Sequence, residues 1–363
     1  MLKKTFLSTT LLMGYLFSFS QTDSTKAAAT PPPVTITGSF DAYYRFNFNA
    51  PQGSTNNLTS FTNSNSSFEL GMATIRADHS FGKASVTLDL GFGRRAQEYS
   101  YNDGNGSGVP GNGFMSLASV KQAFVSYAIS DKFKLTMGKW GTHIGYEVLD
   151  AYLNRNYSMD YMFSYGPFSH TGLKADISLG GVSTLMVGIA NPTDHATDVT
   201  GTKYVIAQFG TGSKNGKFKA YLNYQGADGG SAGSVSQFDV VATATVTDKF
   251  SLGYNGTTYT AKPSGGTSAT TWGSALYVNL DPVSTFGLTL RGEYVDNSKY
   301  AWAISSLGSN LFDLTLSGNC KVGNLTIIPE LRLDNSSEQI FKDSDGNATK
   351  STFSAILAVT YHF

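Results

Sequence analysis

The sequence predicts an all-β protein that forms one transmembrane, antiparallel, up-and-down β-barrel of about sixteen strands. Segments in which apolar and polar residues alternate recur from residue 34 to the last residue. The connections between these segments alternate between short turns and long loops. The composition combines 39 Gly, 24 Phe and 20 Tyr with only 14% charged residues, which suits a chain that is apolar outside and polar inside.

The first 33 residues are expected to precede the barrel. Lys3 and Lys4 are followed by the mostly apolar run FLSTTLLMGYLFSFS (6–20), an order typical of a secretory signal peptide. We therefore expect residues 1–20 to be a signal peptide that is cleaved before Gln21. Residues 21–33, QTDSTKAAATPPP, are predicted to be a flexible, proline-rich linker, and residues 34–363 the barrel.

The first barrel segment, VTITGSFDAYYRFNF (34–48), shows the alternation most clearly. Phe40 and Phe46 belong to its apolar set, and Asp41 and Arg45 to its polar set. Successive side chains of a strand point to opposite faces, so we expect the apolar set to face lipid and the polar set the lumen. The second segment has no clear faces, which indicates a β-bulge. The later segments are expected at about 68–80, 83–95, 117–129, 132–140, 167–179, 182–190, 203–212, 217–226, 236–247, 249–260, 270–281, 285–296, 309–319, 323–334 and 350–363.

The predicted strands are joined in two ways. Short connections such as SDK (130–132) and TDK (247–249) alternate with long ones such as 96–116 and 141–166. Outer-membrane barrels have short periplasmic turns and long external loops, so we assign the short connections to the periplasmic side. The phenylalanines that follow the short turns would form an aromatic girdle there: Phe133, Phe218, Phe250 and Phe286.

The chain ends on the alternating segment FSAILAVTYHF (353–363). We expect this strand to pair with the first, which would close the barrel and leave no unpaired edge in lipid. Tyr361 and Phe363 resemble the carboxyl-terminal signal that the barrel assembly machinery of Gram-negative bacteria recognises. The resemblance implies that machinery and outer-membrane lipid as partners, and the cell outer membrane as the location.

Two stretches resemble a known family. The β-barrel porin type 2 family of Bacteroidota outer membranes is similar in sequence to two stretches, GKWGTHIGYEVLDAYLNRNYSMDYMFSYGPFSHTGLK (138–174) and FDAYYRFNFN (40–49). The resemblance implies an outer-membrane barrel that conducts small solutes, and it supplies no particular substrate. By analogy with sixteen-stranded porins, a homotrimer is the expected oligomer.

Charged residues of both signs are expected on the lumen face. Side chains do not fill the lumen of a barrel of about sixteen strands, so we predict a wetted pore. Charges of both signs on the lumen face would create an electric field across this pore, and such a field favours polar solutes. The alternative is that these residues form ion pairs that brace the wall. The predicted pore-lining residues are Asp41, Arg45, Lys174, Asp176, Arg291, Glu293, Glu330, Arg332 and Asp334.

The loop 141–166 is unusually rich in aromatic residues. A loop in solvent does not need them, so we expect this loop to fold into the lumen and to hold charges at the narrowest point. The alternatives are an external cap or a contact between the subunits of a trimer. The predicted constriction residues are Tyr146, Glu147, Asp150, Arg155 and Asp160.

These observations favour a passive diffusion channel for small hydrophilic solutes and ions. The formal net charge of zero argues against nucleic-acid binding, and the single cysteine, Cys320, rules out an internal disulfide. We expect no cofactor, no bound metal and no enzymatic activity. A closed or plugged barrel that serves as receptor, adhesin or structural partner is the second hypothesis. The third and least favoured hypothesis is an outer-membrane hydrolase that uses His143 or His170.

Overall fold

The computed structural model describes residues 32–103, 117–230 and 233–363. Its contacts divide the chain into two units, Met1–Pro32 and Pro33–Phe363, and the fold described below is that of the second unit. The predicted signal peptide and nearly all of the predicted linker lie outside the described residues.

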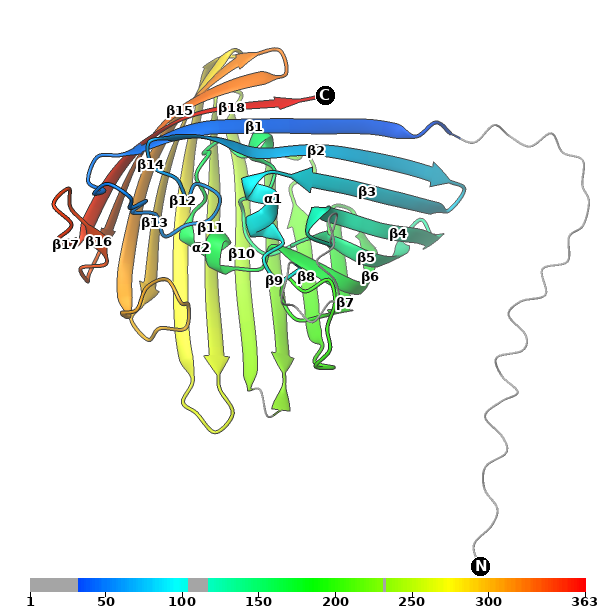
Figure 1. Cartoon of the computed structure of the whole chain (residues 1–363). Helices are drawn as coiled ribbons and strands as arrows, with labels where there is room; N and C mark the ends of the chain where they lie inside the picture. The colour runs from blue at the N-terminus through cyan, green and yellow to red at the C-terminus, as the bar shows by residue number, and fades with distance from the viewer. Residues whose placement is uncertain (1–31, 104–116, 231–232) are drawn as a thin grey trace, which may run out of the picture. The chain divides into compact units, whose positions relative to one another are not determined.

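Sixteen antiparallel strands of the described chain form one closed barrel (Figure 1). Strands that follow one another in the chain are paired, and the first strand also pairs with the last, in a register that sets Asp41 opposite Thr360. Closure satisfies the hydrogen-bonding groups of both end strands. The barrel strands are β1 (Thr35–Asn47), β2 (Ser67–Phe81), β3 (Ala84–Phe92), β4 (Val120–Ser130), β5 (Phe133–Gly141), β6 (Ser169–Gly180), β7 (Ser183–Ala190), β8 (Tyr204–Gly212), β9 (Phe218–Asp228), β10 (Ser234–Thr247), β11 (Phe250–Lys262), β12 (Ala269–Val283), β13 (Phe286–Asn297), β14 (Ser309–Val322), β15 (Leu325–Ser336) and β18 (Ser351–His362).

The remaining elements are short and belong to the long loops. Helix α1 (Arg94–Tyr99) follows β3, and the 3₁₀ turn η1 (Leu117–Ser119) precedes β4. The loop between β5 and β6 contains the 3₁₀ turn η2 (Ala151–Leu153) and helix α2 (Tyr161–Tyr165). Among the described helices none is both long and apolar enough to cross a membrane. A small hairpin of β16 (Phe341–Lys342) and β17 (Ala348–Thr349) precedes β18.

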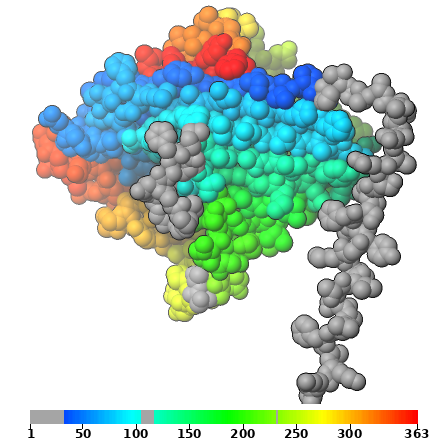
Figure 2. Space-filling view, turned by 45° about the vertical axis from the view of Figure 1, so that its right-hand side comes forward, coloured from blue at the N-terminus to red at the C-terminus, as the bar shows by residue number. Residues whose placement is uncertain are grey.

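The barrel is apolar outside and polar inside, as predicted. On β1 the side chains of Phe40 and Phe46 are 42% and 40% exposed, whereas Asp41 and Arg45 are buried. On the outer surface β1 lies directly beside β18 (blue and red in Figure 2). This arrangement gives lipid a hydrocarbon surface and keeps the charged side chains in the interior.

The structure confirms the strand pattern and corrects several strand limits. The predicted strand 83–95 is too long, because β3 ends at Phe92 and the chain then turns into α1. Gly93 makes this turn with φ of 116°, a conformation that side chains other than glycine rarely adopt. The predicted strand 117–129 begins too early, since residues 117–119 form η1. The hairpin β16–β17 was not predicted.

A β-bulge explains why the second segment shows no clear faces. The register between β1 and β2 shifts at Asp41, so Gly71 is an extra residue on β2. Both Gly71 and Met72 are buried. A Cβ atom at Gly71 would meet the carboxylate of Asp41 and the hydroxyl of Tyr157. Only glycine therefore leaves room for these two groups beside the bulge.

Candidate functional site

The loop between β5 and β6, residues 142–168, lies inside the barrel, where Figure 1 shows α2; we call it the inner loop. Its middle is deeply buried, with Tyr157 and Met159 both 0% exposed. It crosses from β5 to the wall formed by β12–β15, because its polar contacts are made with those strands. A buried, irregular backbone of this kind needs partners for its N–H and C=O groups.

Wall carboxylates accept hydrogen bonds from the backbone of the inner loop. Glu330 on β15 accepts from Tyr157 N at 2.7 Å and from Ser158 N at 3.1 Å. Glu293 on β13 accepts from the first two N–H groups of α2, at 2.7 and 2.8 Å. Such charge-assisted bonds are strong in a buried setting, so these two carboxylates fix the position of the loop.

Wall guanidinium groups bind the carbonyl groups of the same segment. Arg291 Nη1 donates to Ser158 O at 2.7 Å, and Arg332 Nη1 donates to Met159 O at 2.6 Å. Both arginines are paired with carboxylates, so their buried charge is balanced. The closest partners are Glu147 and Asp313 for Arg291, at 2.6 and 2.7 Å, and Asp334 for Arg332, at 2.8 Å.

The inner loop reaches the short-turn end of the barrel. Arg155 forms a bidentate ion pair with Asp281 near the end of β12, with N–O distances of 2.9 and 3.1 Å. Tyr152 stacks on His362 near the end of β18, with ring centroids 4.8 Å apart. The loop therefore spans much of the depth of the lumen on the side of β12–β18.

Asp160 shapes the turn that leads into α2. It caps the helix by accepting from Phe163 N at 2.6 Å, and it accepts from the Tyr277 hydroxyl at 2.6 Å. Its own backbone N–H donates to Glu147 at 2.9 Å. These contacts make Asp160 a structural residue of the loop.

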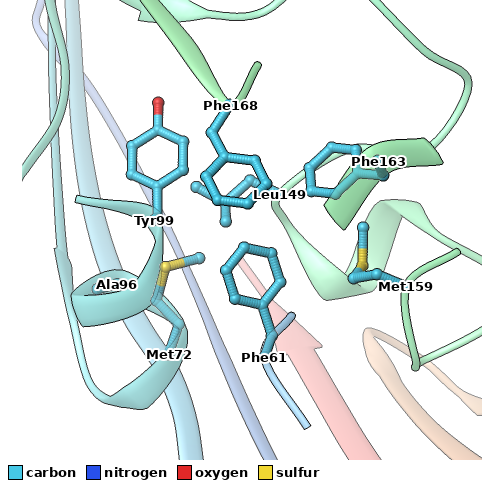
Figure 3. Close-up of a cluster of buried hydrophobic side chains, with 8 residues drawn as sticks. All are labelled: Phe61, Met72, Ala96, Tyr99, Leu149, Met159, Phe163 and Phe168. Carbon is cyan, nitrogen blue, oxygen red and sulfur yellow. The ribbon is translucent and has the colours of Figure 1, made fainter. Parts of the chain in front are cut away.

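Two further loop segments also enter the barrel, which the sequence did not predict. Phe61 from the loop 48–66 and Tyr99 from α1 pack against the inner loop (Figure 3). The Phe61 and Phe163 rings lie 5.4 and 5.3 Å from the Phe168 ring. We call this cluster the loop core; its members are Phe61, Met72, Ala96, Tyr99, Leu149, Met159, Phe163 and Phe168.

Two buried arginines connect these loops to the wall. Arg95 of α1 is 0% exposed; it donates to Leu149 O at 3.2 Å and lies 3.7 Å from Asp41. Arg45 of β1 donates to Thr55 O at 2.6 Å and to another carbonyl of the loop 48–66 at 2.8 Å. One sequence signal for these contacts was an aromatic residue, Phe61, in the mostly polar loop 48–66.

A cavity of about 730 Å³ remains between the inner loop and the wall on the side of β2–β10. The loop contributes Tyr146, Glu147 and Asp150 to its lining. The wall contributes the cations Arg76, Lys121, Lys174 and Lys219, and the amides Gln122, Gln208 and Asn223.

The predicted site residues divide into two groups. Of the nine predicted wall residues, Lys174 lines this cavity. Asp176 does not line it but lies 3.6 Å from the Lys174 ammonium. The other seven contact the inward-folded loops instead. Of the five predicted loop residues, Tyr146, Glu147 and Asp150 line the cavity, while Arg155 and Asp160 hold the loop to the wall.

The cavity cations differ in how they are paired. Lys121 lies 2.8 Å from Asp89 and 2.7 Å from Asp150. The Lys174 ammonium lies over the Trp140 ring, 5.3 Å from its centroid. Lys219 is exposed and makes no ion pair with any described residue.

A second cavity, of about 780 Å³, is lined by the loop 48–66, α1 and the inner loop. Glu98 and Arg94 of α1 face it, and Phe168 lines both cavities. Asp194 accepts from Phe168 N at 2.6 Å and fixes this residue. Burial raises the pKa of Asp194 to about 7, although the hydrogen bonds that its carboxylate accepts lower the pKa in part.

The two histidines considered as catalytic residues lie side by side with tilted rings. The rings of His143 and His170 lie 4.9 Å apart. His143 Nε2 is 3.1 Å from the carbonyl of Tyr224, and burial lowers the pKa of His143 to about 4. Neither ring is within hydrogen-bond distance of a carboxylate in the described structure, so no Ser–His–acid arrangement supports the hydrolase hypothesis. The described residues also contain no cluster of metal ligands.

The carboxyl terminus is part of the barrel ladder. Phe363 and Gly38 exchange two backbone hydrogen bonds, of 3.1 and 3.0 Å. Tyr361 and Phe363 are 42% and 59% exposed.

Solved structures of outer-membrane channels share this fold. The channel DcaP of Acinetobacter baumannii is 12% identical, with a TM-score of 0.59 over 91% of this chain and 97% of DcaP. The anion-selective porin of Comamonas acidovorans is 13% identical, with a TM-score of 0.59 over 91% and 99% of the two chains. The trimer form of OmpT of Vibrio cholerae is 11% identical, with a TM-score of 0.55 over 91% and 99%.

At these identities the structural likeness establishes the fold alone. No curated protein matches the sequence. The family model described as "Putative beta-barrel porin-2, OmpL-like" matches residues 33–363, which is the whole barrel. The chain therefore belongs to the Putative beta-barrel porin-2, OmpL-like family and is an outer-membrane β-barrel of the porin type.

Proposed function

We propose that this protein is a passive diffusion channel for small hydrophilic solutes and ions. The observation that carries the proposal is the cavity between the inner loop and the wall of β2–β10. Charged and amide side chains line it on both sides, so a hydrated solute would exchange water contacts for protein contacts along the way.

The inner loop would form the constriction of this path. Tyr146, Glu147 and Asp150 face the cavity from the loop, and Lys174 faces it from the wall. The remaining predicted residues would act at a distance, because they hold the loop in place. Glu293, Glu330, Arg291 and Arg332 bind its backbone directly, which supports a rigid constriction over a mobile one.

Single-channel conductance of the refolded, mature protein in a planar bilayer tests the proposal. We expect discrete conductance steps, and a changed step size in Asp150→Ala, since this variant removes a cavity charge and one of the two carboxylates that pair with Lys121. Asp345→Ala is the matched control, because Asp345 is exposed in the turn between β16 and β17. Absence of steps from protein that heat-modifiable gel mobility shows to be folded would overturn the proposal.

A closed barrel is the second candidate, and the loop core favours it. Three loop segments pack together inside the barrel and fill part of the lumen beside the cavity. The same conductance experiment separates the two candidates, because a closed barrel would fold and remain silent.

We also propose that the barrel assembly machinery recognises Tyr361 and Phe363, and that the protein forms a homotrimer. The exposure of both aromatic side chains supports the first proposal. The trimer form of a structural neighbour supports the second, which mass measurement of the detergent-extracted protein would test.

A further inference from the structure

We propose that the channel prefers small anions, inorganic and carboxylate, over cations, and that Lys174 and Lys219 set this preference. The inference rests on the proposed channel function and adds the class of solute. It starts from the charges that face the cavity: four are cationic, on Arg76, Lys121, Lys174 and Lys219, and two are acidic, on Glu147 and Asp150.

The two acids that face the cavity are each held in an ion pair. Glu147 lies 2.6 Å from Arg291, a side chain that is 0% exposed and approaches from the wall behind the loop. Asp150 lies 2.7 Å from Lys121. Arg76 is similarly occupied by a bidentate ion pair with Asp78, with N–O distances of 2.6 and 3.0 Å.

Lys174 and Lys219 remain as the cations best placed to meet a solute. The Lys174 ammonium has its nearest carboxylate, Asp176, at 3.6 Å, which is longer than a direct hydrogen bond. It also lies over the Trp140 ring, which offers no negative charge to cancel it. Lys219 has no carboxylate partner among the described residues and is exposed. In the described part of the chain Lys219 is therefore unpaired and Lys174 has only this longer ion pair, so both ammonium groups can donate charge-assisted hydrogen bonds to an anion.

The inner loop separates the other acids from the cavity. Carboxylates are abundant on the opposite wall, but the loop covers them and they are at most 5% exposed. They accept hydrogen bonds from the loop backbone, from tyrosine hydroxyls or from arginines. The covered carboxylates are Glu293, Asp313, Glu330 and Asp334. The loop therefore lies between these carboxylates and the cavity, while the lysines face the cavity directly.

The periplasmic end of the barrel adds to the positive potential. The short turns between barrel strands carry five lysines and two aspartates, and all of them are exposed. Lys219 lies just inside this end, since it follows Phe218, the first residue of β9. The turn residues are Lys83, Lys132, Lys214, Lys217 and Lys249, against Asp131 and Asp248.

Aromatic and amide groups in the same cavity suit carboxylates as well as chloride. Trp140, Tyr146 and Tyr221 line the cavity beside the lysines, so the hydrocarbon part of a small carboxylate would have an apolar surface to contact. Gln208 and Asn223 add neutral hydrogen-bonding groups, which do not oppose either sign of charge.

The reversal potential of the full mature protein in a planar bilayer under a potassium chloride gradient tests the inference. We expect a chloride-to-potassium permeability ratio above unity, falling by about threefold in Lys174→Glu or Lys219→Glu and further in the double variant. Replacing chloride by acetate should leave the preference for the anion in place. Lys262→Glu is the matched control, because Lys262 is exposed at the external end of β11 and does not line the cavity.

The possible results separate the inference from the function on which it rests. A cation-selective or unselective wild-type channel would overturn the inference and leave the diffusion channel intact. An equal shift in Lys262→Glu would overturn the assignment to Lys174 and Lys219. A folded protein without conductance would overturn both proposals together.

Discussion

At the scale of single residues, the wall of this barrel is specialised for holding a loop. Glu293 and Glu330 each accept two backbone N–H groups of the inner loop, and Arg291 and Arg332 each bind one carbonyl. Alternating charges on one face of a strand can line a pore or bind a folded segment. On β13 and β15 they bind the inner loop, and Lys174 on β6 is left to face the cavity.

We predict that Glu293→Ala loosens the inner loop. The variant leaves two buried N–H groups of α2 without an acceptor, at a cost of about 1–3 kcal/mol each. The two groups together cost about 2 kcal/mol or more, so amide hydrogen exchange over residues 157–163 should accelerate by about 30-fold or more, since each 1.4 kcal/mol is a factor of ten. Glu338→Ala is the control, because Glu338 is an exposed residue of an external loop. Unchanged exchange in Glu293→Ala would show that the carboxylate does not hold the loop.

At the scale of elements, the loops form a core of their own inside the barrel. The loop core joins the loop 48–66, α1 and the inner loop through Phe61, Tyr99 and Phe168 (Figure 3). A barrel of sixteen strands cannot fill its lumen with wall side chains, so an apolar cluster there must come from loops. Tyr99, Leu149, Phe163 and Phe168 of this cluster also line the cavity, so the loop core forms part of its boundary.

Phe168→Ala should open the loop core. Removing this ring from contact with Phe61, Tyr99 and Phe163 should destabilise the packed loops by about 3–5 kcal/mol while the barrel ladder stays intact. We expect larger and noisier conductance steps with unchanged heat-modifiable mobility. Val199→Ala serves as the control, since this side chain is 80% exposed in an external loop. Steps identical to wild type would mean that the loop core does not limit the path.

At the scale of the whole molecule, the barrel is closed by the pairing of β1 with β18, in which Phe363 takes part. Phe363 exchanges two backbone hydrogen bonds with Gly38 and so extends the pairing of β18 with β1 beyond His362. Its side chain remains 59% exposed. The backbone pairing of Phe363 and its exposed ring could contribute separately to assembly of the barrel, and substitutions can distinguish the two contributions.

Phe363→Ser should reduce assembly in the outer membrane even though it keeps the backbone pairing, whereas Phe363→Tyr should assemble like wild type. The reason is that only the aromatic side chain distinguishes the two variants in the exposed position. The measurement is the heat-modifiable fraction of the protein in isolated outer membranes. Normal assembly of Phe363→Ser would contradict a role for the aromatic ring.

The sequence by itself determined the strands and their faces. Alternation has a period of two residues and is a local property, so it can be read from β1 to β18 without knowledge of any distant contact. The alternation did not predict strand limits or faces where the local geometry departs from a strand, as at α1 after β3 and at the bulge of Gly71.

Only the tertiary structure decided what the inward-facing charges contact. Glu330 meets Tyr157 across 173 residues of sequence, and Arg291 meets Glu147 across 144. No periodicity connects such pairs, because they depend on how a loop folds within the space that the closed barrel encloses. The sequence therefore specified a charged interior, and the packing of the loops determined that most of these charges hold the inner loop while the lysines of β6 and β9 face the open cavity.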